Sequence, residues 1–178
     1  MVQLDTNDIP QADLIWDVAR VPETILRGAT TTAAVAVSLG DKGPRQGLYY
    51  TQAGRILGLV ADGENGAPLD VTPDGRTFAA YNSQRQRAAL RLLVLRREPT
   101  RYVIAALKQR GGLTRSMLAQ VLQEIAPLSW STALRRAQTM SLWLCALDLV
   151  KRQSGLLVYC GPKTSTVGNE RAEELLVV

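Results

Sequence analysis

Residues 129–142 read SWSTALRRAQTMSL, and the fold depends on what this stretch forms. Its opening hydroxyl residues are typical of a helix N-cap, and an Arg-Arg pair follows within the first two turns. Apolar residues then recur at three- and four-residue spacing, which predicts an amphipathic helix that runs to about Leu147. We expect the inward face to hold Leu134, Ala137, Met140 or Ser141, and Leu144, and the outward face to include Trp130, Thr132, Arg135, Arg136 and Thr139. Such a helix either reads DNA or is a capped surface helix with solvated arginines, and this stretch alone favours neither.

The elements around this helix follow a definite order. Helices are predicted before it over three ranges: 84–98, with Ala88, Leu92 and Leu95 inward; 101–112; and 115–125, capped by Thr114 and ended by Ala126-Pro127. After it, LDLVKRQSGLLVYC (147–160) predicts a β-hairpin whose apolar arms flank KRQSG. This order, in which helices are followed by a hairpin, is that of a winged helix-turn-helix.

The first half of the chain shows a similar order. Helices are predicted over 10–21, ended by Pro22; between Gly28 and Gly40, with an N-cap from Thr30–Thr32; and from Arg45 onward, with Leu48, Ala53, Ile56 and Leu57 inward. Gly47 and Gly54 weaken the last of these predictions. LGLVADGENGAPLDVTPDGRTFAAY (57–81) then predicts a hairpin with a loop of turn residues, followed by a capped start at Thr72.

The predicted fold is therefore mainly α with short β-hairpin wings, arranged as a tandem winged helix-turn-helix. The first module would span residues 1–82, and the second would span 83–178 with a polar C-terminal tail (163–178). The repeat is one of architecture, because the two halves show no residue-by-residue sequence repeat.

Charge is distributed unevenly along the chain. The net charge is +5, with a pI near 9.6. Residues 84–136 hold eleven Lys or Arg against Glu98 and Glu124, whereas the first 27 residues carry five carboxylates against two arginines. A strongly basic half indicates an anionic partner, most often nucleic acid, although a merely solvated basic surface has the same composition.

Composition excludes several classes of function. At 46% apolar and 21% charged, the chain is typical of a soluble globular protein. No stretch has the ~18 apolar residues of a membrane span, and the acidic start is unlike a signal peptide, so we expect a cytoplasmic protein. The chain has no histidine and two cysteines, which excludes Ser-His-Asp and Cys-His catalysis and a structural zinc site. Carboxylates do not cluster, and no GxxxxGK[ST] loop occurs, so we expect no enzyme, no cofactor and no metal.

The candidate DNA contacts lie on the two predicted reading helices and the hairpins. In the first module they are Arg45, Gln46, Tyr49, Tyr50, Gln52, Arg55 and Arg76; in the second they are Ser129, Ser131, Thr132, Arg135, Arg136, Thr139, Lys151 and Arg152. Arginine can pair bidentately with guanine, while hydroxyls and free amides at a helix start can hold phosphates. The acidic tip of the first hairpin, with Asp62 and Glu64, argues against phosphate contact there, and Arg76 would compensate.

Two stretches resemble a known family. PRQGLYYTQAGRILGLV followed by LDVTPDGRTFA, and LSWSTALRRAQTMSLWLCAL, are similar to the tandem winged-helix DNA-reading modules associated with bacterial type II restriction endonucleases and related phage-defence proteins. The matching residues are Arg45, Gln46, Tyr49, Tyr50, Ala53, Leu57, Gly58, Leu59, Thr72, Gly75 and Arg76 in the first stretch, and Ser129, Ser131, Thr132, Arg135, Arg136, Thr139, Trp143 and Leu144 in the second. Most of residues 10–160 takes part in this likeness.

The resemblance implies sequence-sensitive binding of double-stranded DNA, with nuclease activity in a separate domain for which this chain has no room. The chain would be a DNA-recognition region, a specificity subunit of a restriction or phage-defence system, or a standalone transcriptional regulator. A nuclease or other effector subunit and a homodimer stay open as partners. The alternative from a different class is a protein-interaction or dimerisation adaptor built on winged helices, whose acidic N-terminus docks a basic partner.

Overall fold

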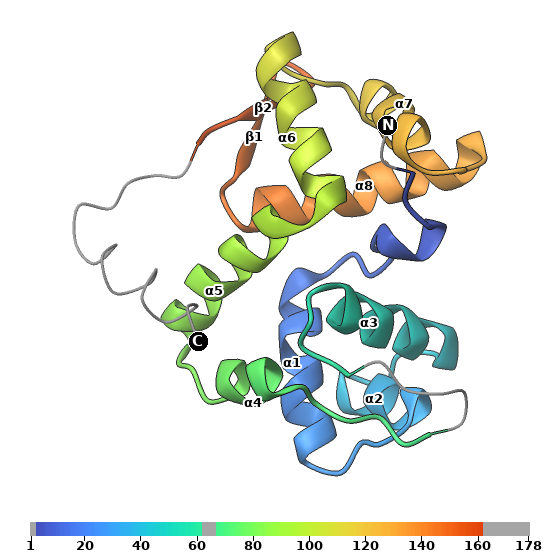
Figure 1. Cartoon of the computed structure of the whole chain (residues 1–178), viewed down its shortest axis with the longest axis vertical. Coiled ribbons are helices and arrows are strands. Elements are labelled where there is room, and N and C mark those ends of the chain that lie inside the picture. Colours follow the sequence, from blue (N-terminus) through green and yellow to red (C-terminus); the bar gives the residue numbers. More distant parts are fainter. Residues whose placement is uncertain (1–2, 62–66, 162–178) are drawn as a thin grey trace.

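The computed structural model describes residues 3–61 and 67–161, and within them the protein is mainly helical with one small antiparallel hairpin (Figure 1). The elements are η1 (Thr6–Asp8), α1 (Ile15–Leu26), α2 (Thr32–Ser38), α3 (Pro44–Ile56), α4 (Pro73–Ala79), α5 (Ser83–Arg96), α6 (Glu98–Arg110), α7 (Arg115–Ile125), α8 (Trp130–Ala146), β1 (Val150–Gln153) and β2 (Leu156–Tyr159). The expected mainly α fold with a hairpin is confirmed. The predicted tail 163–178 and the acidic tip with Asp62 and Glu64 lie outside the described residues.

The first helix begins and ends later than predicted. Pro22 lies inside α1 and does not end it. Proline removes one backbone hydrogen bond from a helix, but burial of the apolar face on both sides of Pro22 holds the helix together. Val18, Val21 and Ile25 are all buried. The prediction of a helix over 10–21 was wrong at both ends. Pro22 is a helix breaker by its local chemistry, but the sequence does not show the packing that keeps the helix intact around it.

Helices α2 and α3 pack unusually closely through a glycine. Thr31 caps α2 as expected, with its side chain accepting from the Ala34 amide. An added Cβ on Gly47 would lie 2.0 Å from the Thr32 carbonyl oxygen, so α3 approaches α2 where only a hydrogen fits. The glycine that weakened the prediction of α3 is thus a requirement of its packing.

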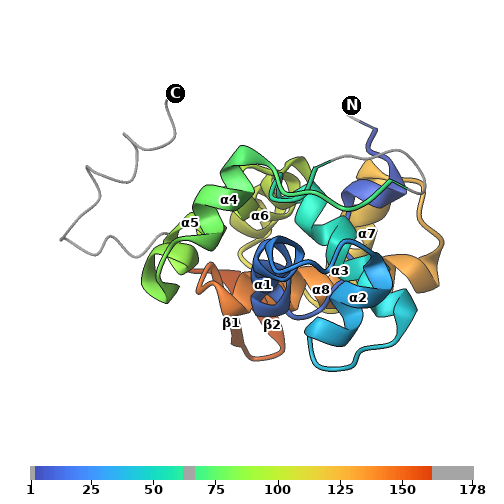
Figure 2. The same cartoon turned by 90° about the horizontal axis from the view of Figure 1, so that it is seen from below.

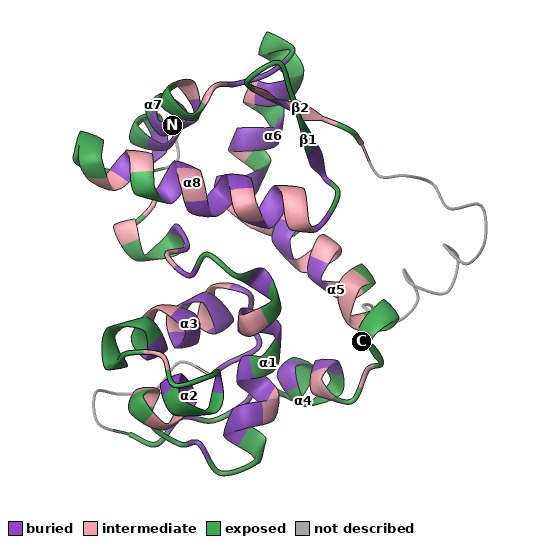
Figure 3. Cartoon of the chain, turned by 180° about the vertical axis from the view of Figure 1, so that it is seen from behind, coloured by how far each residue is buried: buried purple, intermediate pink, exposed green. Residues whose placement is uncertain are grey.

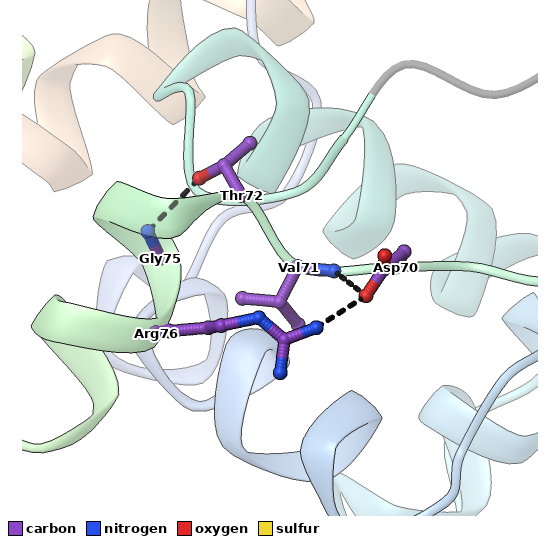
Figure 4. Close-up of polar contacts among 5 residues, drawn as sticks. All are labelled: Asp70, Val71, Thr72, Gly75 and Arg76. Atoms are coloured by element: carbon purple, nitrogen blue, oxygen red, sulfur yellow. Dashed lines mark hydrogen bonds and ion pairs between the residues drawn. The ribbon is translucent and has the colours of Figure 1, made fainter.

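In the described part of the first predicted hairpin, which excludes residues 62–66, the pairing is one antiparallel bridge between Val60 and Val71. The Leu69 amide also donates to the Thr30 carbonyl at 2.8 Å, so three chain segments meet at this edge. Thr72 caps α4 by accepting from the Gly75 amide at 2.9 Å, as expected (Figure 4).

Helix α5 carries the chain from one half to the other, and α4 and α5 lie along one side of the molecule (Figures 1 and 2). Its buried residues are Leu90 and Val94. The prediction placed Ala88, Leu92 and Leu95 inward, but Ala88 is exposed and the two leucines are half-buried. A helix that spans two halves buries different faces at its two ends, so a single periodic face does not describe it.

In the second half, α6, α7 and α8 precede the hairpin β1–β2. Thr114 caps α7 and Ser129 caps α8, as expected. The hairpin pairs Val150 with Tyr159 through to Gln153 with Leu156. Its turn is Ser154–Gly155, both with positive φ, which suits a two-residue turn. Leu113, between α6 and α7, pairs with Leu157 and adds a third segment to the hairpin edge.

The segment before α1 crosses to the second half of the molecule. The Leu4 amide donates to the Ile125 carbonyl at 2.8 Å, at the end of α7. Ile9 and Ala12 are buried, and the segment passes between α3 and α8 before α1 begins (Figure 1). Residues 4–13, which the sequence assigned to the first module, thus pack against helices of the second.

Candidate nucleic-acid interface

The start of α8 presents three hydroxyl side chains close together. Ser129 Oγ donates to Thr132 Oγ1 at 3.0 Å, and lies 3.3 Å from Ser131 Oγ. Ser129 Oγ also accepts from the Thr132 amide, which caps the helix. Ser129 and Ser131 are exposed and Thr132 is half-buried. The structure therefore brings together the three hydroxyls predicted as phosphate contacts, at the positive end of the helix dipole.

The two arginines of α8 differ in their surroundings. Arg135 is exposed, whereas only 6% of Arg136 is exposed, and Thr139 is buried as well. Arg136 Nη1 donates to the Ile9 carbonyl, and Thr139 Oγ1 donates to Asp13 Oδ1 at 2.5 Å. The prediction that Arg136 and Thr139 face outward was wrong, because the segment 9–13 covers that side of α8. Figure 3 shows buried residues recurring along the whole of α8.

Arg136 is a buried cation without a carboxylate partner. Among the described residues it forms no ion pair within 4.0 Å, and its Nε has no hydrogen-bond partner. Burial, together with a smaller contribution from the neighbouring charge of Arg135, lowers the pKa of the guanidinium to about 10. The group is still charged at neutral pH, so the fold holds a desolvated positive charge that it does not neutralise.

The start of α3 presents an arginine held on a tyrosine. Arg45 Nε donates to Tyr49 Oη at 2.6 Å, and the guanidinium lies 5.6 Å from the centre of the same ring. Arg45 and Gln46 are exposed and Tyr49 is half-buried. The contact fixes the direction of Arg45, because stacking and a hydrogen bond together restrict a long side chain.

The inward face of α3 differs from the prediction at two positions. Tyr50, predicted to contact DNA, is buried, and burial raises the pKa of its phenol. Leu48, predicted inward, is 49% exposed. The buried side of α3 is set by α1, α2 and the crossing segment, not by the apolar residues of α3 alone.

The candidate reading helices α3 and α8 line one pocket. Its volume is about 290 Å³, and it is bounded by Gln11, Ala12, Asp13, Gln46, Tyr49, Tyr50, Arg115, Arg135, Arg136, Gln138 and Thr139. The N-terminal half of α3 and the middle of α8, which the sequence placed in separate modules, therefore lie next to one another. Candidate contacts from both halves of the chain converge on one region.

Three other candidates of the first module lie apart from this pocket. Arg55 is half-buried, and its Nε donates to the Ala61 carbonyl at 3.3 Å. Gln52 is half-buried on α3. Arg76 is exposed, but its Nη2 lies 2.9 Å from Asp70 Oδ1, which also accepts from the Val71 amide (Figure 4). Arg76 therefore forms an ion pair with Asp70 next to the Val60–Val71 bridge.

The β1–β2 hairpin presents Lys151 and Arg152, both exposed. They lie in β1 and not at the tip, since the turn is formed by Ser154 and Gly155. Burial raises the pKa of the Cys145 thiol, and the nearby Arg152 offsets part of that shift. Because successive side chains of a strand point to opposite faces, Lys151 lies on the face of the hairpin opposite Arg152.

The sequence reading missed Arg115, which lies on α7. This exposed arginine donates from Nε to the Leu134 carbonyl at 3.1 Å, which holds its side chain along α8 beside the pocket. A single arginine after a capping threonine gives no signal of this contact, because the contact depends on how α7 packs on α8. Gln138, another lining residue, gave no signal either.

The exposed cations of this region form no ion pair with a carboxylate. Within residues 3–61 and 67–161 this holds for Arg45, Arg115, Arg135, Lys151 and Arg152, and elsewhere for the exposed Arg85, Arg96 and Lys108. Seven other cations are each paired with a carboxylate: Arg20, Arg27, Lys42, Arg76, Arg87, Arg101 and Arg110. Unpaired arginines on neighbouring elements make a surface suited to an anionic polymer. The same ranges hold no group of three or more metal-ligating residues, and no helix there is long and apolar enough to cross a membrane.

A family model described as "Domain of unknown function (DUF7226)" matches residues 23–147, which is most of the chain. No curated protein and no solved structure matches the chain. The match begins within α1 and ends just after α8, so it includes both candidate reading helices.

Proposed function

We propose that this chain, which belongs to the DUF7226 family, is a non-catalytic double-stranded DNA-binding protein built from two winged helix-turn-helix modules. The observation that carries the proposal is the convergence of the N-terminal half of α3 and the middle of α8 on one pocket lined by Arg115, Arg135 and Arg136. In a helix-turn-helix, the N-terminal residues of the second helix reach base edges in the major groove.

The element order supports the winged modules. In the second half, α6, the Leu113 segment, α7, α8 and the hairpin β1–β2 follow one another, with Leu113 paired to the hairpin strand β2. The first half has α1, the Thr30 segment, α2, α3 and the Val60–Val71 bridge in the same order. In this assignment α3 and α8 are the recognition helices, and the bridge and the hairpin are the wings.

The exposed candidates divide by their chemistry into two groups. Arg45, Gln46 and Arg135 are exposed in the N-terminal halves of the recognition helices, where side chains can contact either base edges or phosphates. Ser129, Ser131, Thr132, Lys151 and Arg152 would hold phosphates. Arg136, Thr139 and Tyr50 are buried, so the proposal assigns none of them to a base edge.

The proposal is tested by binding of a random-sequence duplex pool to the full chain at several salt concentrations. Phosphate-driven binding weakens steeply with salt, with a slope of about −0.9 per phosphate neutralised. Selection of bound duplexes from the same pool then gives the site sequence. Negligible affinity for duplex DNA at low salt would refute the proposal and favour the adaptor alternative.

The restriction or phage-defence setting is part of the proposal and rests on the resemblance of residues 44–79 and 128–147 alone. A DNA-recognition region of such a system needs an effector with nuclease activity on another chain or domain. Co-purification of a nuclease with the full-length protein would support this setting, whereas binding upstream of genes without any such partner would favour a transcriptional regulator. Reproducible cleavage of DNA by the pure chain with magnesium would contradict the non-catalytic proposal.

A further inference from the structure

The pocket between α3 and α8 has an excess of positive charge that the fold does not compensate. Its lining contains Arg115, Arg135 and Arg136, and a single carboxylate, Asp13. Asp13 Oδ1 accepts the hydroxyl of Thr139, and among the described residues Asp13 makes no ion pair within 4.0 Å. The pocket therefore carries a net charge of +2 from its lining side chains.

Burial makes this imbalance costly for one of the three arginines. Arg136 is only 6% exposed, and among the described residues only its Nη1 has a hydrogen-bond partner, the Ile9 carbonyl. A buried charge without a counter-ion is rare, because the lost hydration must be replaced. An anion in the adjoining pocket would supply the missing counter-charge.

The uncharged residues of the lining match the same chemistry. Gln46 from α3 and Gln138 from α8 add amide donors, and Tyr49 adds a phenol. Arginine favours planar, bidentate contacts with phosphate and carboxylate oxygens. A volume of about 290 Å³ suits a small molecule and is at the lower end for ligand pockets.

We propose that this pocket is a binding site for a phosphate group, held by Arg115, Arg135 and Arg136 with Gln46 and Gln138. The phosphate belongs either to a small molecule, such as inorganic phosphate or a phosphomonoester, or to the backbone of bound DNA. Because residues from α3, α7, α8 and the crossing segment line the pocket, a bound phosphate would join both halves of the chain.

The test is isothermal titration of sodium phosphate into the full chain, without DNA, at constant ionic strength balanced with sodium chloride. We expect saturable binding of one phosphate per chain and a rise in the thermal midpoint of unfolding. Arg115→Ala and Gln138→Ala should each weaken phosphate binding, and the double variant by at least about tenfold. Arg101→Ala is the matched control, since Arg101 is an exposed arginine paired with Glu98 on α6, outside the pocket.

Arg136→Lys tests the buried guanidinium itself. Lysine keeps the positive charge but loses the planar fork, so phosphate affinity should fall while the charge in the pocket is unchanged. Arg115→Ala and Gln138→Ala keep the test valid if Arg136→Lys does not fold, because neither side chain is buried. Absence of saturable binding, or equal binding by the wild type and the double variant, would overturn the proposal.

A second arm distinguishes the two sources of the phosphate. If the pocket takes a backbone phosphate, saturating inorganic phosphate should compete with duplex DNA at constant ionic strength, and Arg115→Ala should weaken duplex binding. If it takes a small molecule, phosphate should leave duplex affinity unchanged. Phosphate binding without any duplex affinity would support the pocket and refute the DNA proposal, so failures of the two are distinguishable.

Discussion

The indole Nε1 of Trp143 donates to the carbonyl of Ala12 at 2.6 Å, which ties the middle of α8 to the segment before α1. Trp143 is 2% exposed and is among the largest fully buried side chains. Together with the contacts of Arg136 to Ile9 and Thr139 to Asp13, this bond fastens a short peptide along one face of α8. These contacts decide which residues of α8 are available to a partner.

Trp143→Phe should destabilise the protein. Phenylalanine keeps most of the buried ring but leaves the Ala12 carbonyl without its donor, which costs about 1–3 kcal/mol for a buried group. The change is measured as the free energy of unfolding in urea. Trp130→Phe is the control, because Trp130 is 45% exposed and its replacement should shift stability by less than about 0.5 kcal/mol. Equal effects at the two positions would contradict the described role of Trp143.

Gly47→Ser should be strongly destabilising, whereas Gly43→Ser should be tolerated. A Cβ at position 47 would lie 2.0 Å from the Thr32 carbonyl oxygen, and the overpacking costs about 1–3 kcal/mol or more. Position 43 is the N-cap of α3, with no atom within 4 Å of an added Cβ, and serine is a favoured N-cap residue. Thermal unfolding of the two variants, monitored by circular dichroism, checks both outcomes. Similar midpoints would show that α2 and α3 are not in close contact.

Arg135→Ala should weaken duplex binding, because Arg135 is the exposed member of the arginine pair on α8. If it holds a phosphate, affinity should fall uniformly across sequences and the salt slope should shrink by about 0.9. If it reads a base, preference should relax at one position of the site instead. Fluorescence anisotropy with labelled duplexes measures both. Arg101→Ala serves as the control, and an unchanged affinity for Arg135→Ala would remove Arg135 from the interface.

Lys151→Ala should lower duplex affinity without changing sequence preference. Lysine acts as a point charge toward phosphate, and Lys151 extends from the hairpin with no carboxylate partner among the described residues. The expected loss is smaller than for Arg135→Ala, and the salt slope should shrink by about 0.9 for the one contact removed. Arg27→Ala is the control, since Arg27 on α1 is exposed and pairs with Glu23 at 2.6 Å. Equal losses for the two variants would indicate a general effect of net charge and no specific role for the hairpin.

Local signals in the sequence were sufficient for most of the helices. Thr31, Thr72, Thr114 and Ser129 each cap the helix that the sequence predicted, because a cap needs only its own side chain and the next three residues. The β1–β2 hairpin was also predicted, since its apolar arms and turn residues are adjacent in the chain. The predicted helix end at Pro22 was wrong because local signals were not sufficient there. The burial of α1 against other helices outweighs the local cost of a proline.

The candidate site was less predictable, because its geometry depends on residues far apart in sequence. Arg136 and Thr139 have the helical positions of outward residues, but the segment 9–13 covers them. The same kind of packing buries Tyr50 and leaves Leu48 exposed. Periodicity finds the two faces of a helix but does not say which partner covers which face.

Residues 9–13, which contact α8, affect how the protein can be divided into fragments. The contacts of Ile9, Ala12 and Asp13 with α8 span 126 to 131 residues of chain. A fragment that begins at residue 83 would contain every element of the second half yet lack the acceptors for Arg136, Thr139 and Trp143. We therefore expect the C-terminal half, expressed alone, to be less stable than the same half in the intact chain. A peptide of residues 4–13 added in trans should restore part of that stability.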